Sequence, residues 1–207
     1  MEDSSGGWRR AVIGLLRNGL ISPPAIRLDG QRVSIRPPLA RDWQEWSDLR
    51  DRSRAFLTPW EPTWPADALA RTAYLRRLRR QLIEWRDDEA YSFLAVERRT
   101  DRVVGGIGLS NIRRGVAQTG TLGYWVGETY ARRGYMSEAT RLTLDFAFGQ
   151  LGLHRIEAAC LPTNAPSRGL LEKVGFQYEG YARGYLRIDG AWRDHVLYAI
   201  LREEWRG

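Results

Sequence analysis

Alternation of apolar and polar residues predicts strands at several places along the chain. The alternation between residues 32 and 36 has the period of a half-buried strand. Six further segments have strand character: 91–96, 102–109, 119–126, 155–161, 177–188 and 192–201. Thr100-Asp101 joins one pair of these strands as a turn, and Asp189-Gly190 joins the last pair.

Apolar residues three or four positions apart predict helices between the strands. Asp42 is the expected N-cap of a helix that buries Trp43, Trp46 and Leu49. Gly175 is the expected C-terminal stop of the last helix. The further amphipathic segments are residues 67–85, 137–151 and 166–174.

The order of these elements indicates the domain division and the fold class. Residues 56–62 predict an aromatic loop, and residues 8–16 predict a short helix that two following prolines end. We expect an N-terminal appendage over residues 1–30 and one domain over residues 31–207. Helices and strands do not alternate strictly, which favours an α/β (α+β) domain with a mixed, largely antiparallel sheet of about six or seven strands.

Composition fits a globular domain. Of the 207 residues 43% are apolar and nine are Trp, which argues against disorder. Cys160 is the only cysteine and His154 and His195 are the only histidines, so we expect no disulfide and no metal site. No apolar run approaches the roughly 20 residues of a membrane span, and the N-terminal run is too short for a secretory signal. A cytoplasmic protein with no membrane partner is expected.

The positive charge suits several classes of partner. The net charge is +7, and Lys173 is the only lysine. Such a charge favours nucleic acid, a ribosomal surface or a phosphorylated cofactor. The polar face of the predicted 67–85 helix is either solvated or docks an acidic partner or RNA; it carries Arg71, Arg76, Arg77, Arg79 and Arg80. No nucleic-acid motif is present, so direct nucleic-acid binding is not expected, although the charge leaves it open.

A predicted strand, a loop and a helix follow one another over residues 123–139. The start of such a helix has backbone N–H groups without partners, and together with the helix dipole they bind phosphate. Gly134 lets a ligand approach the backbone, and Arg132 and Arg133 add positive charge. The Gly-Lys-Ser/Thr pattern of a P-loop is missing, so the residues favour a phosphate-binding turn of another kind.

Two ordered motifs resemble those of the GNAT acetyltransferases. Residues 123–139, GYWVGETYARRGYMSEA, resemble the acyl-CoA pyrophosphate loop. Residues 164–176, NAPSRGLLEKVGF, resemble the family's Asn-x-x-Ser and Gly-Phe segment. With residues 59–62 and 192–195 the resemblance covers roughly residues 32–202, and it is strongest to the ribosomal-protein alanine N-acetyltransferases of the RimJ/RimL type.

The resemblance implies a fold and a cofactor. Helices would cover both faces of a sheet that is splayed between the strands at 119–126 and 155–161, with the pantetheine of acetyl-CoA in the gap. The loop departs from the family pattern at Ala131 and Met136, but a cradle of backbone N–H groups tolerates both changes. The implied cofactor-binding residues are Trp125, Val126, Arg132, Arg133, Gly134, Tyr135, Met136, Ser137, Asn164 and Ser167.

The resemblance also implies catalytic roles. A backbone N–H in the splayed strand would polarise the thioester carbonyl, and Ser167 aligns with a serine that would protonate the departing thiolate. The family's general-base glutamate would fall at Leu186, which cannot accept a proton. Glu157 is the first substitute as base and Glu128 the second. Other groups that stay open as bases are Glu61, Asp194 and His195.

The function implied is acetyl transfer to a primary amine. An N-terminal α-amino group of a protein, such as a ribosomal protein, is the favoured acceptor, because its pKa near 8 makes deprotonation inexpensive. Trp60 and Tyr185 are expected to contact the acceptor. The alternatives are acetylation of a small amine (an amino acid, a polyamine or an antibiotic) and a non-catalytic acyl-CoA-binding module. Either a monomer or a homodimer is compatible with the sequence.

Overall fold

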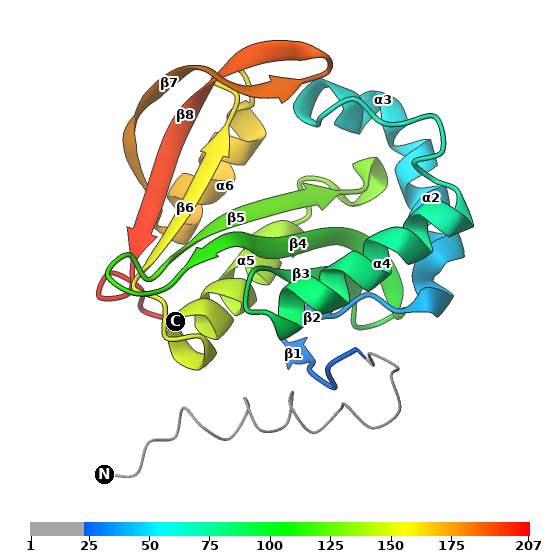
Figure 1. Cartoon of the computed structure of the whole chain (residues 1–207), viewed down its shortest axis with the longest axis horizontal. Coiled ribbons are helices and arrows are strands. Elements are labelled where there is room, and N and C mark those ends of the chain that lie inside the picture. The colour runs from blue at the N-terminus through cyan, green and yellow to red at the C-terminus, as the bar shows by residue number, and fades with distance from the viewer. Residues whose placement is uncertain (1–22) are drawn as a thin grey trace.

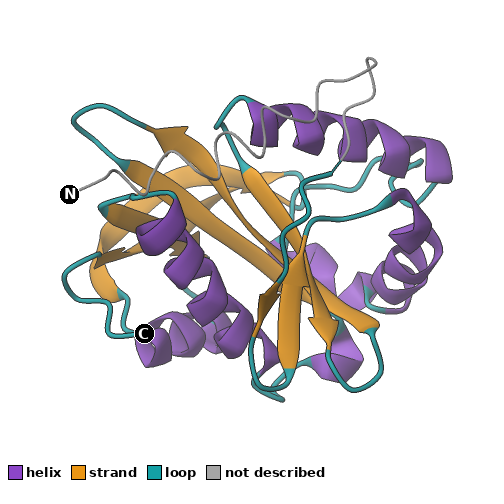
Figure 2. Cartoon of the chain, turned by 90° about the horizontal axis from the view of Figure 1, so that it is seen from below, coloured by secondary structure: helices purple, strands orange, loops and turns teal. Residues whose placement is uncertain are grey.

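The computed structural model describes residues 23–207. They form one eight-stranded sheet in the order β1-β2-β3-β4-β5-β6-β8-β7, with helices on both sides (Figure 1, Figure 2). The strands are β1 (Leu28–Asp29), β2 (Val33–Arg36), β3 (Tyr91–Glu97), β4 (Arg102–Arg113), β5 (Thr119–Val126), β6 (Arg155–Cys160), β7 (Gln177–Ile188) and β8 (Ala191–Leu201). The helices are η1 (Ala40–Asp42), α2 (Trp43–Arg52), α3 (Arg54–Leu57), η2 (Thr58–Trp60), α4 (Arg71–Arg86), η3 (Glu128–Tyr130), α5 (Tyr135–Asp145), the π-helical η4 (Phe146–Gln150) and α6 (Ala165–Val174).

The sheet confirms the expected mixed, largely antiparallel class. Neighbouring strands are antiparallel except β5 and β6, which run parallel. The expected count of six or seven strands was wrong, because the two-residue β1 is too short to show a period. The described sheet therefore begins at Leu28, ahead of residue 31. The division into an appendage and a domain stays a prediction, since the expected helix at 8–16 lies outside the described residues.

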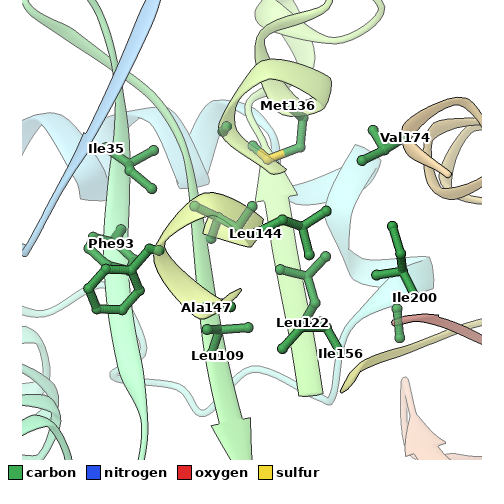
Figure 3. Close-up of a cluster of buried hydrophobic side chains, with 14 of the residues drawn as sticks. Ile35, Phe93, Leu109, Leu122, Met136, Leu144, Ala147, Ile156, Val174 and Ile200 are labelled. Atoms are coloured by element: carbon green, nitrogen blue, oxygen red, sulfur yellow. The ribbon is translucent and has the colours of Figure 1, made fainter. Parts of the chain in front are cut away.

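One face of the sheet carries the larger hydrophobic core, under α5 and α6. Leu144 of α5 and Val174 of α6 meet Leu122 and Ile156 from the two parallel strands (Figure 3). Ile35 of β2 belongs to the same cluster and is fully buried. This packing fixes α5 and α6 against β5 and β6.

The other face is covered by α2 and α4. Trp46 and Leu49 of α2 and Tyr74 and Leu78 of α4 pack with Leu94 of β3 in a second buried cluster. The apolar positions of both helices thus point to the sheet, as their spacing predicts. The two-sided covering that the family resemblance implies is confirmed (Figure 2).

Two predicted boundaries need correction. Residues 56–62 were expected as a loop, but α3 and η2 occupy most of this segment, and Pro59 lies in the first turn of η2, where its missing N–H costs no hydrogen bond. The long helix begins at Arg71 instead of residue 67, because residues 67–70 form a turn in which Ala70 N donates to Asp67 O.

Candidate active site

The sheet opens between its two parallel strands. β5 and β6 pair only from Thr119 to Thr121 against Arg155 to Glu157. Beyond that point β5 continues along β4 and β6 continues along β8, so the two diverge (Figure 1). In the described part of the chain, residues 122–126 therefore have no strand neighbour on the β6 side. The splay expected between these strands is confirmed.

The start of α5 provides unused backbone donors. Gly134 is its N-cap, with φ +82°, a conformation that favours glycine. The first intrahelical bond runs from Glu138 N to Gly134 O at 3.2 Å, so the N–H groups of Tyr135, Met136 and Ser137 have no intrahelical partner. Such a helix start binds an anion.

Contacts from the start of β2 hold this turn in place. Arg32 Nη1 donates to Arg133 O at 3.0 Å, and Arg32 N donates to Glu138 Oε1 at 2.9 Å. A Cβ on Gly134 would lie 2.6 Å from Arg32 Nη2. The loop is therefore tied to the sheet at its base and has no room for a side chain toward Arg32.

The side chains of the turn separate into two groups. Met136 is 5% exposed and points into the buried cluster of Figure 3. Its methyl group packs on Gly105, while Tyr135 is buried and bonds Glu97 through its hydroxyl. Arg132 and Arg133 are exposed. Met136, where the loop departs from the family pattern, thus directs its bulk into the core, and the N–H groups and the two arginines are what the turn offers an anion.

The start of α6 faces the splayed strand. Asn164 is the N-cap, and its Oδ1 accepts from Ser167 N at 3.1 Å. Ser167 Oγ lies 2.7 Å from the hydroxyl of Tyr124 on β5. Burial raises the pKa of Tyr124 above its ordinary value, against an opposing effect of the Ser167 hydrogen bond. The phenol stays protonated at neutral pH, and the pair forms a hydrogen-bonded hydroxyl contact across the gap.

The single thiol lies close to this pair. Cys160, at the end of β6, is buried. Burial raises the pKa of its thiol, and a hydrogen bond from Ser167 acts in the opposite direction. The raised pKa keeps the group a protonated thiol at neutral pH.

The two carboxylates expected as bases have different surroundings. Glu157 is on β6 beside the splay, and it is held by Arg155 at 3.1 Å and Arg113 at 3.5 Å. Glu128 is exposed at the end of β5, and its backbone N–H donates to Ser53 Oγ at 3.0 Å. The ion pairs of Glu157 are compatible with a structural role. The contacts of Glu157 and Glu128 do not show whether either carboxylate acts as the base.

Glu61 sits in a polar and aromatic cluster. Its carboxylate bonds the Arg50 guanidinium, which is 8% exposed, and accepts from Trp64 Nε1 at 2.7 Å. The same guanidinium lies over the rings of Trp64 at 4.3 Å and Trp125 at 4.7 Å. This cluster joins α2, the segment after η2 and the splayed end of β5.

A cavity of about 400 Å³ lies between α4 and the sheet. Its floor includes Gly106 and Gly123; the face of β5 is open at Gly123, whereas the Trp125 ring lies over Gly106. A Cβ on Gly123 would have no atom within 4 Å, whereas one on Gly106 would meet the Trp125 ring. Tyr124 and Trp125 line the cavity and also belong to the splayed part of β5, so the cavity and the gap adjoin.

The predicted acceptor contacts lie elsewhere. Trp60 is half-buried in η2, and Tyr185 is exposed on β7 against the His195 ring at 5.6 Å. Neither lines the cavity. The two segments that carry them touch, because Asp189 N donates to Glu61 O at 3.0 Å. Leu186, where the resemblance implies a glutamate, is 42% exposed on β7.

Two groups of the site are not recognisable as site residues from the sequence: the Tyr124 hydroxyl, and the Arg77 guanidinium on the cavity wall, which was expected only as part of a polar helix face. Tyr124 is contained in the first motif, but its contact with Ser167 joins two motifs that are distant in sequence. Arg77 is one of five similar arginines on its helix, and only the fold distinguishes it.

A sheet splayed beside a helix start with free N–H donors defines the class of acyl-CoA-dependent acyltransferases. The chain belongs to the GNAT acetyltransferase family, since the family described as "Acetyltransferase (GNAT) domain" matches residues 32–177. It is an acetyl-CoA-dependent N-acetyltransferase.

Relatives of similar length support the assignment. The chain is 35% identical to the probable N-acetyltransferase YjcK of Bacillus subtilis over 86% of this chain and 98% of that protein. It is 33% identical to the [ribosomal protein uS5]-alanine N-acetyltransferase of Escherichia coli over 88% and 94%. The structure of Mycobacterium smegmatis RimJ in complex with CoA-disulfide superposes with a TM-score of 0.80 at 35% identity, covering 84% of each chain.

Proposed function

We propose that the protein acetylates the N-terminal α-amino group of a protein, such as a ribosomal protein. The observation that carries this proposal is that Tyr124 and Trp125 line both the splay and the cavity. An acyl donor in the gap and an amine in the cavity would meet at these residues. The similarity to a relative named for alanine N-acetylation of a ribosomal protein supports this class of acceptor.

The residues fit acetyl-CoA as the donor, which supplies the activated acetyl group. The free N–H groups of Tyr135, Met136 and Ser137, with Arg132 and Arg133, would hold the pyrophosphate. Gly134 would keep the backbone accessible. On the splayed strand the backbone of Trp125 and Val126 would pair with the pantetheine, and Asn164 would donate through Nδ2, since its Oδ1 caps α6. These roles are the ones that the family resemblance implies for the same positions.

We assign the proton-donor role to Ser167, supported by Tyr124. The Tyr124 hydroxyl is hydrogen-bonded to Ser167 Oγ, and burial keeps its own proton in place. Ser167 would then give its proton to the leaving thiolate from the α6 side of the gap while the Tyr124 hydroxyl donates a hydrogen bond to its Oγ, and the proton lost by the acylated amine would restore the Ser167 hydroxyl. The acceptor amine has a pKa near 8, so positioning contributes much of the rate. Glu157 and then Glu128 remain our proposed bases, with water as the intermediate carrier.

Small amines are the second candidate class of acceptor. The cavity of about 400 Å³ has room for an amino acid as well as for the first residue of a peptide. Trp60 and Tyr185, outside the cavity, would contact only an acceptor that extends beyond it. A longer acceptor therefore uses more of this surface.

We place the protein in the cytoplasm, where nascent ribosomal proteins and acetyl-CoA are both present.

A turnover screen tests the proposal. The release of CoA thiol from acetyl-CoA is measured with N-terminal peptides that begin with alanine or serine, with the same peptides blocked by formylation, and with amino acids, polyamines and aminoglycosides. We expect turnover with free peptides and none with blocked ones. Faster turnover with any small amine than with all peptides would contradict the proposal, and absence of turnover with every amine would favour a non-catalytic acyl-CoA-binding module.

A further inference from the structure

One basic side chain on the cavity wall has no acidic partner. Arg77 projects from α4 and lines the cavity together with Arg80 and Glu84. Arg80 pairs with Glu84 at 3.3 Å, whereas no ion pair links Arg77 to any carboxylate of the described residues. Its guanidinium instead lies 5.6 Å from the Trp46 ring. The wall of the cavity thus holds one uncompensated positive charge.

The surroundings of Arg77 disfavour that charge. Burial lowers the pKa of the guanidinium, and the neighbouring positive charges of Arg50 and Arg80 lower it further. Glu61 acts in the opposite direction, but its carboxylate is already bonded to Arg50 and Trp64. The residue as a whole is exposed, so the guanidinium of Arg77 is accessible to a ligand although the rings and cations beside it reduce its hydration. A charge held in this way is stabilised by an anion that enters the cavity.

Geometry connects this charge to the reacting end of the site. Arg77 and Arg50 lie over the same Trp46 ring at 5.6 and 5.5 Å, and Arg50 also lies over Trp125 at 4.7 Å. Trp125 is at the splayed end of β5. Apart from Arg77, Arg80 and Glu84, the lining is apolar, aromatic or glycine, with Gln81 and the hydroxyls of Ser92 and Ser110 as further polar groups. If the reactive amine of the acceptor lies near Trp125, the substituent next to that amine faces the cavity wall that carries Arg77.

We infer that the acceptor carries a carboxylate close to its reactive amine, and that Arg77 binds this carboxylate. This inference rests on the proposed acetyl transfer and narrows its substrate: a peptide with an acidic residue directly after the first one is favoured, and cationic acceptors such as polyamines are disfavoured. Arg77 is a specificity-determining residue here, because it contacts the acceptor away from the reacting atoms. Its planar guanidinium suits a bidentate contact with a carboxylate.

The test compares acceptors that differ only in charge. Amidated peptides beginning Ala-Glu-Glu, Ala-Gln-Gln and Ala-Lys-Lys are assayed with the wild-type protein, with Arg77→Gln and with Arg79→Gln. Arg79 is an exposed arginine of the same helix that does not line the cavity, so it is the matched control. For the wild type and for Arg79→Gln we expect kcat/KM to be about tenfold higher for the acidic than for the neutral peptide, mainly through KM.

In Arg77→Gln the ratio between acidic and neutral peptides should fall toward one, because the charge that binds the carboxylate is absent. The ratio is taken within one variant, so a general change in activity or stability cancels from it. An unchanged ratio in Arg77→Gln, or equal kcat/KM for acidic and neutral peptides in the wild type, overturns the inference. If only small amines turn over, the proposed protein substrate fails, and the inference is tested with glutamate α-amide against glutamine α-amide. Calorimetric titration of the CoA-loaded protein with the acidic and neutral peptides gives the same comparison without turnover.

Discussion

Hydrogen bonding between two hydroxyls links the motifs that define the site. Ser167 belongs to the start of α6 and Tyr124 to the splayed strand, and their oxygens are 2.7 Å apart. Sequence comparison with the family singles out Ser167, because it stands at a fixed position after Asn164. It gives Tyr124 no role, because the contact exists only once α6 has packed beside β5. At this scale the sequence indicates which groups are present, and the fold determines which of them act together.

Removal of the Ser167 hydroxyl tests the proton-donor role. For Ser167→Ala we expect kcat to fall roughly tenfold to a hundredfold, because a positioned general acid contributes at least this much, while the Kd for acetyl-CoA stays within about threefold. Tyr124→Phe should cause a smaller loss, and the double variant should lose less than the product of both effects, since the hydroxyls act as one unit. Thr72→Ala, which removes an exposed hydroxyl on α4, is the control. Unchanged kcat in Ser167→Ala would exclude the acid role.

At the scale of elements, the spacing of apolar residues along the chain predicts most strands and helices. β5 and α6 lie within a residue of their expected bounds, because strong alternation or a glycine stop marks them. α5 begins at Tyr135, earlier than the expected 137, because the positive φ of Gly134 turns the chain and the next two side chains enter the core. The cavity could not be predicted, since it depends on glycines of two strands that share one face only after β4 and β5 have paired.

The turn before α5 is the element on which cofactor binding depends. We expect Gly134→Glu to raise the Kd for acetyl-CoA at least tenfold, about 1.4 kcal/mol, because it places a negative charge at a helix start that would bind phosphate. Gly134→Ala adds no charge but combines the strain of the positive φ, about 1–2 kcal/mol of folding stability, with a contact of its Cβ against Arg32, and it should retain more of the binding than Gly134→Glu. Gly149→Glu adds the same charge at an open, exposed position. Calorimetry that finds wild-type affinity in Gly134→Glu would place the cofactor elsewhere.

The glycine floor between β4 and β5 gives a test of the acceptor cavity. A side chain at Gly123 meets no atom within 4 Å at its Cβ, so Gly123→Leu should fold normally and project into the cavity. The KM for the acceptor should then rise roughly tenfold, about 1.4 kcal/mol of lost binding, with the Kd for acetyl-CoA unchanged. Gly149→Leu, also in open space but outside the cavity, should behave as wild type. An unaltered acceptor KM in Gly123→Leu would show that the amine binds outside this cavity.

For the molecule as a whole, the site depends on segments from both ends of the described chain. α5 is tied to β2 through Glu138, and the turn between β7 and β8 is tied to the segment after η2 through Asp189 N and Glu61 O. The side chain of Glu61 continues this link to α2 by its bond to Arg50. The hairpin, α2 and the splayed end of β5 are therefore held by one cluster.

No described helix is long and apolar enough to cross a membrane.

Breaking this cluster should cost more than breaking a surface ion pair. In Glu61→Gln the buried Arg50 guanidinium loses its carboxylate while the shape of the side chain is kept, and we expect the free energy of unfolding to fall by roughly 2–3 kcal/mol. The control is Asp67→Asn, which breaks the exposed pair of Asp67 and Arg76 and should cost less than about 1 kcal/mol. Urea unfolding measures both variants.

The double variant Arg50→Met/Glu61→Gln tests why Glu61→Gln loses stability. The cause is either the unpaired charge left on Arg50 or the loss of the contact itself. If the cost in Glu61→Gln comes from leaving Arg50 charged and unpaired among Trp46, Trp64 and Trp125, replacing Arg50 by an apolar side chain of similar length should restore part of the stability. The three indole rings would then enclose an apolar side chain that needs no partner. A double variant less stable than Glu61→Gln alone would mean that the cation–aromatic contacts of Arg50, and not its ion pair, hold the hairpin, α2 and β5 together.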